Sequence, residues 1–280
     1  MMQPHQWQSG DVSLVGDLFG REDAPTVVLL HGGGQTRHAW AAAARHLAKA
    51  GYRVVTYDAR GHGESSWAGD ANYTIGALAA DLRAVAAEIT GPVVLVGASM
   101  GGLTAFYALG EQVWPQVRGL VMVDVVLQPD RRGTQRVRDF MQGHPEGFVS
   151  LGEAAMAVAA YNPHRPRPQH ASGLMKNLRQ SADGRLRWHW DPALLGGSWD
   201  NDEREALLLA VSGNVRLPVL VLRGSRSDVV GEDDVARMRR HVPQLEVEDI
   251  EGAGHMISGD RNDAFLAAIE RFLMRHDLRR

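Results

Sequence analysis

The sequence has 280 residues, of which 44% are hydrophobic and 22% are charged, and its formal net charge at pH 7 is −3. It contains no cysteine, which excludes disulfide-stapled folds, cysteine-ligated metal centres and thiol nucleophiles. The small negative charge gives no electrostatic reason to bind nucleic acid. The length fits one large α/β domain that carries an insertion.

The chain shows no targeting or membrane signal. Its N-terminus has no basic cluster followed by an apolar stretch, so it does not resemble a secretory signal. The longest apolar runs, such as Leu217–Leu222, are far shorter than the ~20 residues needed to cross a bilayer. We therefore expect a soluble, cytoplasmic protein with neither a membrane nor a nucleic-acid partner.

The strand-like segments favour a mostly parallel sheet. Asp11–Phe19 comes first and alternates apolar and polar side chains, which predicts a strand with one solvated face. The later segments are short, nearly continuous apolar runs, which are typical of strands buried on both faces. They are Thr26–Leu30, Arg53–Tyr57, Val93–Val96, Leu120–Val123 and Val219–Leu222. Leu245–Ile250 is also strand-like.

Helix-like segments lie between these strands. Ala39–Ala50 is rich in alanine and ends at Gly51, and Thr74–Ile89 places its apolar residues on one helical stripe. The other helix-like segments are Leu103–Leu109, Asp233–His241 and Asn262–His276. Alternation of strands and helices predicts βαβ units and a doubly wound sheet.

Residues 126–213 interrupt this alternation. The region has no clear strand, several short helix-like pieces and a segment rich in proline and arginine, Pro163–Pro168. Because the sheet pattern resumes at Val219, we interpret the region as a mostly helical cap inserted into a core made of residues 1–125 and 214–280. The alternative is a second independent domain.

The clearest chemical motif is Gly-x-Ser-x-Gly at Gly97–Gly101, directly after a predicted strand and before a helix. A tight strand-to-helix turn exposes the Ser99 hydroxyl at the carboxyl edge of the sheet, and the two glycines remove side chains where there is no room. The alternatives are a glycine-rich turn with an incidental serine and a dinucleotide-binding turn. The second lacks the Gly-x-Gly-x-x-Gly pattern.

A glycine run follows the strand at Thr26–Leu30. His31 precedes three consecutive glycines, and such a loop lets the backbone approach a substrate oxygen closely. Acyl transfer passes through an oxyanion that needs two amide donors at about 3 Å. We predict that the amides of Gly33 and Met100 are these donors, with Gly34 as the competitor for the first. A phosphate-binding loop is disfavoured because no Lys-Ser/Thr pair follows.

A serine nucleophile needs a base and an acid that orients the base. His255 lies in a glycine-rich loop after the last predicted strand and is the predicted base. Asp228 and Asp124 each follow a predicted strand and compete for the role of the acid. We predict Asp228, because it lies one strand–helix unit before the histidine in the order Ser…Asp…His, with Asp124 as the second choice.

Taken together, these motifs resemble those of the α/β-hydrolase fold superfamily over nearly the whole chain. The residues that carry the resemblance are His31–Gly34, Asp58–Ser65, Gly97–Gly102, Gly224–Asp228 and Gly254–His255. The resemblance implies a mostly parallel eight-stranded sheet, a helical cap after the sixth strand, and a Ser–His–Asp triad that uses no metal or organic cofactor.

Within the superfamily, the motifs look like those of the esterase, lactonase, carbon–carbon hydrolase and cofactor-free perhydrolase branch. Haloalkane dehalogenases and epoxide hydrolases place an aspartate where this chain has Ser99, and dienelactone-hydrolase-like enzymes use a cysteine, which this chain lacks. The predicted function is therefore a serine hydrolase that cleaves a small carboxylic ester or lactone. Carbon–carbon bond hydrolysis and perhydrolysis on the same triad remain alternatives, as does a non-catalytic ligand receptor with this fold.

The cap is expected to determine the substrate. The candidate pocket residues are His31, Gly34, Trp188 and Trp190, and the competing interpretation of the tryptophans, including Trp199, is that they pack the cap onto the core. Four arginines of the cap could attract an anionic substrate, and the alternative is that they only form a solvated surface. They are Arg165, Arg167, Arg185 and Arg187.

Overall fold

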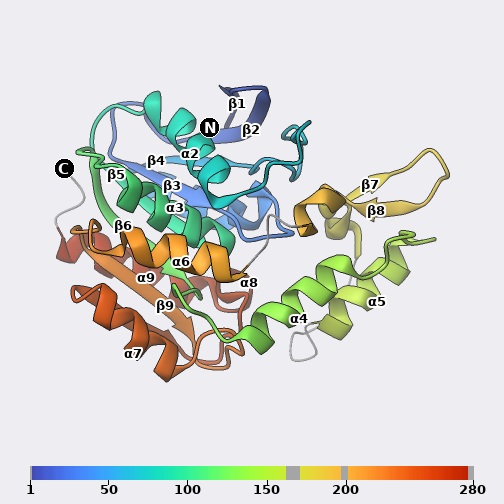
Figure 1. Cartoon of the computed structure of the whole chain (residues 1–280). Coiled ribbons are helices and arrows are strands. Elements are labelled where there is room, and N and C mark those ends of the chain that lie inside the picture. Colours follow the sequence, from blue (N-terminus) through green and yellow to red (C-terminus); the bar gives the residue numbers. More distant parts are fainter. Residues whose placement is uncertain (1, 162–170, 197–200, 277–280) are drawn as a thin grey trace.

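A central sheet of eight strands organises the molecule, in the order β1-β2-β4-β3-β5-β6-β9-β10 (Figure 1). The structure is a computed structural model and describes residues 2–161, 171–196 and 201–276. The strands are β1 (Gln3–Ser9), β2 (Val12–Phe19), β3 (Thr26–Leu30), β4 (Arg53–Tyr57), β5 (Val93–Ala98), β6 (Val117–Val123), β9 (Val219–Gly224) and β10 (Leu245–Ile250). β2 pairs antiparallel with β1 and β4, and the remaining pairs are parallel. The predicted mostly parallel, eight-stranded sheet is confirmed.

The edge strand β1 was not predicted from the sequence. Its residues are mostly polar, and only Trp7 among them is buried. β1 therefore shows little of the hydrophobic pattern that marks a strand. It is held by its pairing with β2 along the whole of its length, from Gln3 opposite Leu18 to Ser9 opposite Val12.

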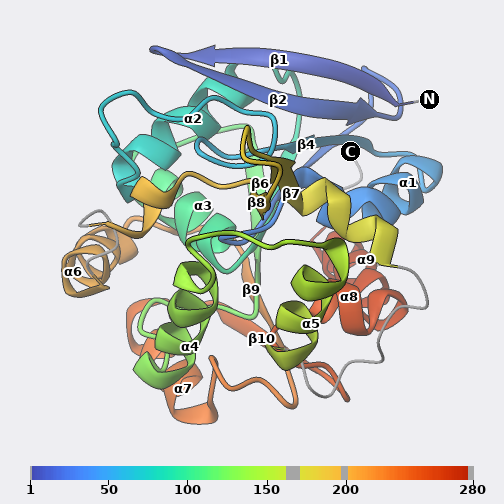
Figure 2. The same cartoon turned by 90° about the vertical axis from the view of Figure 1, so that its right-hand side faces the viewer.

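Helices cover both faces of the sheet, as expected of a doubly wound fold. One face packs against α2 (Ile75–Ala87), α3 (Met100–Glu111), α6 (Asn201–Ser212) and α7 (Glu232–His241). The opposite face packs against α1 (Ala41–Lys49) and α9 (Asn262–Arg275). Figure 2 shows the two groups on either side of the strands. The apolar runs of the parallel strands supply side chains to both of these core layers.

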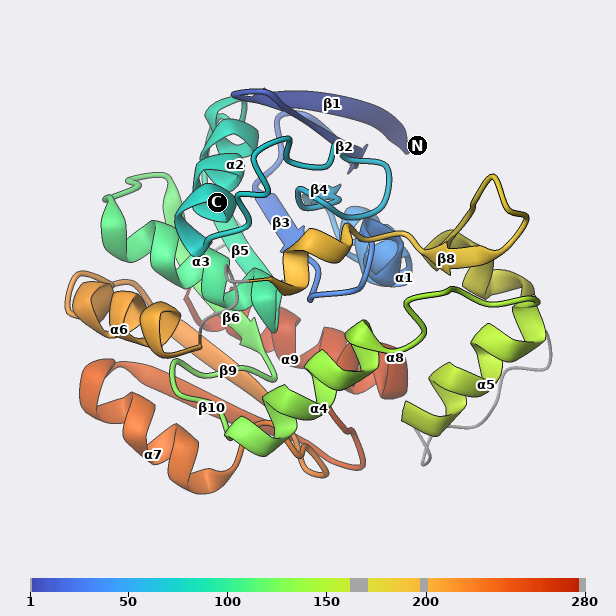
Figure 3. The same ribbon diagram turned by 45° about the vertical axis from the view of Figure 1, so that its right-hand side comes forward.

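The insertion after β6 lies beyond the carboxyl edge of the parallel strands (Figure 3). It contains α4 (Arg131–Gln142), α5 (Leu151–Tyr161), the 3₁₀ helices η2 (Ala171–Asn177) and η3 (Pro192–Leu195), and the hairpin strands β7 (Leu178–Gln180) and β8 (Leu186–Trp188). The hairpin corrects the prediction that this region has no strand. Its strands are only three residues long and carry arginines, so their sequence gives no strand signal.

The insertion has its own small apolar core, separate from the two core layers of the sheet. Its buried members include Met141, Phe148, Trp188 and Trp190. Helix α6, by contrast, packs against α3, where Val211 contacts Gly110. The predicted division into a core of 1–125 and 214–280 and a cap of 126–213 stays a prediction. Pro163–Pro168 and Trp199 lie outside the described residues, and none of the described helices has the length and apolarity to cross a membrane.

Candidate active site

Ser99 lies on a tight turn between β5 and α3. Its backbone has φ 45° and ψ −114°, in the left-handed region that a residue other than glycine rarely adopts. A Cβ atom on Gly97 would lie 2.4 Å from the carbonyl carbon of Gly101, and one on Gly101 would lie 2.6 Å from the Leu30 carbonyl oxygen. The turn therefore requires both glycines, and it holds Ser99 at the carboxyl edge of the sheet.

His255 pairs with a buried carboxylate. Its Nδ1 lies 2.7 Å from Oδ2 of Asp124, which directly follows β6 and has no exposed surface. The Gly224 amide donates to Asp124 Oδ1 at 2.9 Å, and the Ser227 hydroxyl donates to Oδ2 at 2.5 Å. These two donors, from the end of β9 and the loop after it, fix the carboxylate so that it accepts the Nδ1 proton of His255 and leaves Nε2 on the opposite side of the ring.

The prediction that Asp228 orients the histidine is wrong. The Asp228 carboxylate is 43% exposed and forms an ion pair with Arg136 of α4. The loop after β9 contributes the hydroxyl of Ser227 to the histidine–aspartate pair instead, while the acid comes from the neighbouring strand β6. The second choice of the sequence analysis, Asp124, is the carboxylate that is hydrogen-bonded to Nδ1 of His255.

The glycine loop after β3 has two of its three amides already engaged. The Gly32 amide donates to Oε1 of Gln35 at 3.0 Å, and the Gly34 amide donates to Nε2 of His62 at 3.1 Å. Within the described part of the chain, neither the Gly33 amide nor the Met100 amide has a protein acceptor. Met100 is the first residue of α3, where a helix amide has no intrahelical partner. The arrangement favours Gly33 over Gly34 as the donor to an oxyanion.

Two buried histidines, His31 and His62, form hydrogen bonds with the backbone of this loop. The Ala59 amide donates to Nε2 of His31 at 2.9 Å, so Nδ1 carries the proton and donates to the Gly32 carbonyl at 2.8 Å. His62 accepts the Gly34 amide at Nε2 in the same way. A nitrogen that accepts from a backbone amide carries no proton, so both rings are held neutral. His31 was a candidate pocket residue, but it lies beneath the loop and lines neither compartment of the cavity described below.

A third histidine comes from the insertion. The Gly63 amide donates to Nδ1 of His189 at 2.7 Å, and Nε2 donates to the Gly34 carbonyl at 3.3 Å. His189 thus connects the insertion to the glycine loop. The sequence analysis considered His189 only with its tryptophan neighbours as a pocket residue and did not predict this contact, because a lone histidine carries no pattern that indicates it.

Burial lowers the pKa of all three histidines. The pKa of His31 lies below its ordinary value, that of His62 lies well below it, and that of His189 falls to about 4. Desolvation is the largest cause in each case, and the rings also disfavour each other's charge, with centroids 5.0 Å apart for His31–His62 and 5.8 Å for His62–His189. The cluster is neutral at physiological pH.

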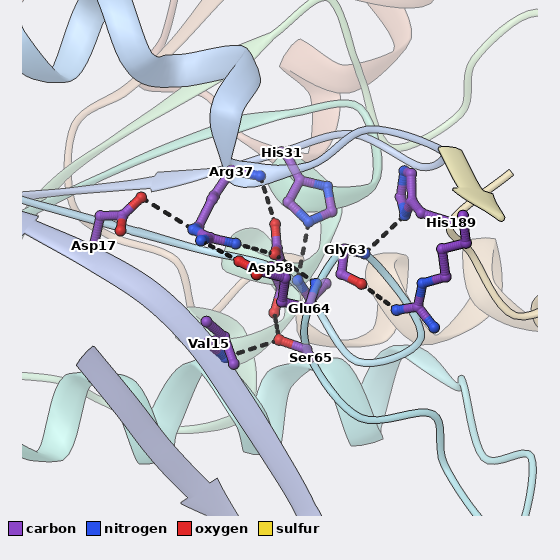
Figure 4. A network of polar contacts seen from close by, with 11 residues as sticks. Val15, Asp17, His31, Arg37, Asp58, Gly63, Glu64, Ser65 and His189 are labelled. Atoms are coloured by element: carbon purple, nitrogen blue, oxygen red, sulfur yellow. Dashed lines mark hydrogen bonds and ion pairs between the residues drawn. The ribbon is translucent and has the colours of Figure 1, made fainter. Parts of the chain in front are cut away.

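A buried ionic network lies behind the same loops (Figure 4). The Arg37 amide donates to Oδ1 of Asp58 at 2.7 Å, and its guanidinium binds Asp58 and Asp17 as well as Glu64. Asp58 is fully buried, and its backbone carbonyl accepts from the Ser65 hydroxyl at 2.6 Å. The network anchors the loop of residues 58–65, which in turn carries His62 and the amide bound by His189.

Ser99 and His255 line a cavity with two compartments. The larger one has a volume of about 370 Å³ and lies between the glycine loop and the insertion, with Phe140, Tyr161 and Trp188 among its walls. The smaller one has a volume of about 40 Å³ and adjoins the Gly33 and Met100 amides. A cavity of this size fits a small organic molecule with its reacting carbonyl at Ser99.

The predicted pocket residues Gly34, Trp188 and Trp190 line the larger compartment. The two tryptophan rings stack with centroids 4.9 Å apart and belong to the apolar core of the insertion. Both interpretations of the tryptophans therefore describe the same residues. The Arg185 and Arg187 guanidinium groups bind acceptors within the insertion, while Arg165 and Arg167 lie outside the described residues.

Within the described ranges, no group of three or more histidines, aspartates or glutamates is placed to hold a metal ion. The chemistry that the described residues themselves offer is a serine hydroxyl, an imidazole paired with a carboxylate, and backbone amides.

Comparison with known proteins places this arrangement in a family. The chain is 30% identical to the esterase Rv0045c of Mycobacterium tuberculosis over 89% of its own length and 83% of that protein. It is 31% identical to the bovine protein phosphatase methylesterase 1, over 47% of this chain and 36% of that protein. The crystal structure of E-2-(acetamidomethylene)succinate hydrolase shares the fold, with a TM-score of 0.84, 21% identity and coverage of 98% of this chain and 99% of that one. Residues 25–261 match the model of the alpha/beta hydrolase fold family. The family resemblance is thus confirmed, and the chain belongs to the alpha/beta hydrolase fold family.

Proposed function

We propose that the protein is a serine hydrolase that cleaves a small carboxylic ester or lactone through an acyl-enzyme. Its named relatives include an esterase and a methylesterase, which supports ester hydrolysis as the class of reaction. The finer assignment depends on the residues of the site. The observation that carries it is that a strained Ser99 lines one cavity with His255, whose ring is hydrogen-bonded to the buried Asp124.

In this proposal, Ser99 attacks the substrate carbonyl while Nε2 of His255 accepts the hydroxyl proton. Asp124 holds the ring through Nδ1 and stabilises the imidazolium that forms. His255 then protonates the departing alcohol oxygen, which leaves an acyl group on Ser99. In the second half, His255 takes a proton from water, the hydroxide attacks the acyl carbon, and Ser99 regains its proton as the acid departs.

Both tetrahedral intermediates carry an oxyanion next to the nucleophile. The amides of Gly33 and Met100 are the proposed donors, because each lines the smaller compartment together with Ser99 and neither is engaged elsewhere in the described part of the chain. Donors that are already fixed in place stabilise developing charge without reorganisation, and each contributes about 10²-fold or more to turnover.

Two measurements test the proposal. A fluorophosphonate probe labels an activated serine, so the wild-type protein should be labelled at Ser99, and the Ser99→Ala variant should not. Hydrolysis of a panel of short-chain esters and lactones should fall by about 10³-fold or more in the variant. Equal hydrolysis by the two proteins, or a folded wild type that resists the probe, would contradict the serine mechanism. The second outcome would favour a ligand receptor.

A further inference from the structure

Arg138 of α4 lines the smaller compartment of the cavity, beside Ser99 and His255. Its side chain is half-buried, and its guanidinium donates one hydrogen bond, to the Leu195 carbonyl at 3.0 Å. Among the residues that the structure describes, no carboxylate pairs with it. A guanidinium has five N–H donors and keeps its charge in any protein environment. Within the described ranges, Arg138 therefore brings a positive charge without a paired carboxylate to the compartment that Ser99 and His255 line.

The other arginines of the same helix differ from Arg138 in this respect. They form ion pairs with Asp202, Asp130 and Asp228, in the order Arg131, Arg132 and Arg136. Those pairs lie at the surface, where a charge needs no partner. Arg138 is less exposed, and arginines removed from water are ordinarily paired with an acid. The lack of a paired acid among the residues that the structure describes points to an anion that arrives with the ligand.

The walls of the cavity agree with this interpretation. Among the described residues, no aspartate or glutamate lines either compartment. Thr134, Asn201 and a second arginine, Arg204, add polar groups to the same compartment, and Arg204 donates to Oδ1 of Asn201 at 2.6 Å. The compartment has a volume of about 40 Å³, which leaves room for a small polar group of the substrate beside Arg138.

We propose that the substrate carries a carboxylate, and that Arg138 binds it in the smaller compartment while the larger compartment takes an apolar or aromatic part. The planar guanidinium matches the two oxygens of a carboxylate, which a lysine at the same place does not. The inference depends on the proposed ester hydrolysis and narrows its substrate class to esters or lactones of dicarboxylic acids and related molecules.

The experiment compares matched acidic and neutral esters. Monoethyl succinate, glutarate and adipate are each paired with the half-ester half-amide of the same length, which replaces the carboxylate by an uncharged group of the same shape. The wild-type enzyme should hydrolyse at least one acidic ester with a kcat/KM about tenfold or more above that of its amide partner. In Arg138→Gln this ratio should fall to about one, and in Arg138→Lys it should be intermediate.

Two further variants locate the effect. Arg132 lies on the same helix and is exposed, so Arg132→Gln should keep the wild-type ratio. Lys176 lines the larger compartment, so Lys176→Gln should keep most of the preference for the acidic ester over its amide partner. A ratio of about one in the wild type would overturn the inference, and so would a ratio lost in Lys176→Gln but kept in Arg138→Gln. Thermal melting and the rate of fluorophosphonate labelling show whether each variant is folded.

A binding measurement separates this inference from the proposed function. Glutarate should slow the labelling of Ser99 in the wild type, glutaramide should not, and the protection should be lost in Arg138→Gln. Labelling that glutarate and glutaramide affect equally would contradict the Arg138 assignment alone. A folded wild type that the probe does not label would contradict the serine mechanism, and the inference with it.

Discussion

The carboxyl edge of the sheet and the insertion above it are held by different kinds of contact. At the sheet edge, glycines that admit no side chain, a fully buried Asp124 and neutral histidines fix the backbone. The insertion depends on its small apolar core and on surface pairs such as Arg131–Asp202, whose side chains are 65% and 70% exposed. The first region leaves little freedom for sequence change, whereas the second leaves more, which agrees with the prediction that the insertion determines substrate specificity.

The two regions meet at residues 188–191. His189 contacts the glycine loop, the Asp191 amide donates to the Gly61 carbonyl at 2.9 Å, and the Tyr73 hydroxyl donates to the Asp191 carboxylate. This short segment of the insertion therefore shares the fixed character of the sheet edge.

A glycine-to-alanine substitution should have opposite effects on the free energy of unfolding in the two regions. Gly97→Ala places a Cβ within 2.4 Å of backbone atoms in α3, so we expect it to lower the free energy of unfolding by about 3 kcal/mol or more and to abolish labelling of Ser99. Gly152→Ala in α5 meets nothing closer than Ser150 Oγ at 3.7 Å and should stabilise the helix by about 0.5–1 kcal/mol. Urea unfolding measures the change in free energy of unfolding for both variants. Similar changes would contradict the proposed difference between the sheet edge and the insertion.

Removing a charge should have an effect that depends on the region. Asp58→Asn leaves the buried Arg37 with less compensation, and we expect it to lower the free energy of unfolding by about 3 kcal/mol. Asp183→Asn breaks an exposed pair with Arg187 in the insertion and should produce no measurable change. Chemical denaturation of both variants tests this, and an unaltered midpoint for Asp58→Asn would show that the network is not a stabilising anchor.

The neutral histidines predict a loss of stability in mild acid. The pKa of His189 is about 4 in the folded protein, against an ordinary value of 6.5. The unfolded chain therefore binds the additional proton first, and stability falls as the pH drops from about 6.5 towards 4, by about 3 kcal/mol for this residue alone. His189→Gln removes the contribution of this histidine, so the unfolding free energy of the variant should depend less steeply on pH than that of the wild type. An identical slope in both proteins would refute the assignment.

Two variants of His189 separate its contacts. The amide nitrogen of His189→Gln lies near the position of Nε2 and keeps the donor to the Gly34 carbonyl. His189→Asn keeps an acceptor near Nδ1 for the Gly63 amide. If His189 positions the glycine loop, kcat should fall about tenfold in His189→Asn and less than about threefold in His189→Gln. KM should change little in both variants. A reversed order in steady-state kinetics would assign the effect to the 58–65 loop.

The sequence predicted the fold and indicated candidate site residues, because its motifs constrain the backbone. The turn at Ser99 and the loop after His31 each require glycines at particular positions. Such glycine patterns are recognisable in the sequence. The acid was harder: Asp124 and Asp228 both follow strands that end at the same sheet edge, and both lie between Ser99 and His255 in the chain. What separates them is burial and the hydroxyl of Ser227, and neither is visible in a linear pattern.

The insertion was predicted least well, for a related reason. Its strands β7 and β8 have three residues each, and its contacts with the site come from single side chains such as His189 and Arg138. Such contacts depend on tertiary packing and leave no periodicity in the sequence. Arg138 looks like its neighbours in the chain until the structure shows which of these arginines has an acid beside it.

The most direct test of the central claim compares the two aspartates in one assay. Asp124→Asn should lower kcat for ester hydrolysis by about 10³–10⁴-fold, because an uncharged partner neither orients His255 correctly nor stabilises the imidazolium. Asp228→Asn should stay within about threefold of the wild type, because its carboxylate binds Arg136 at the surface. The opposite order, with Asp228→Asn inactive and Asp124→Asn active, would contradict the proposed triad of Ser99, His255 and Asp124.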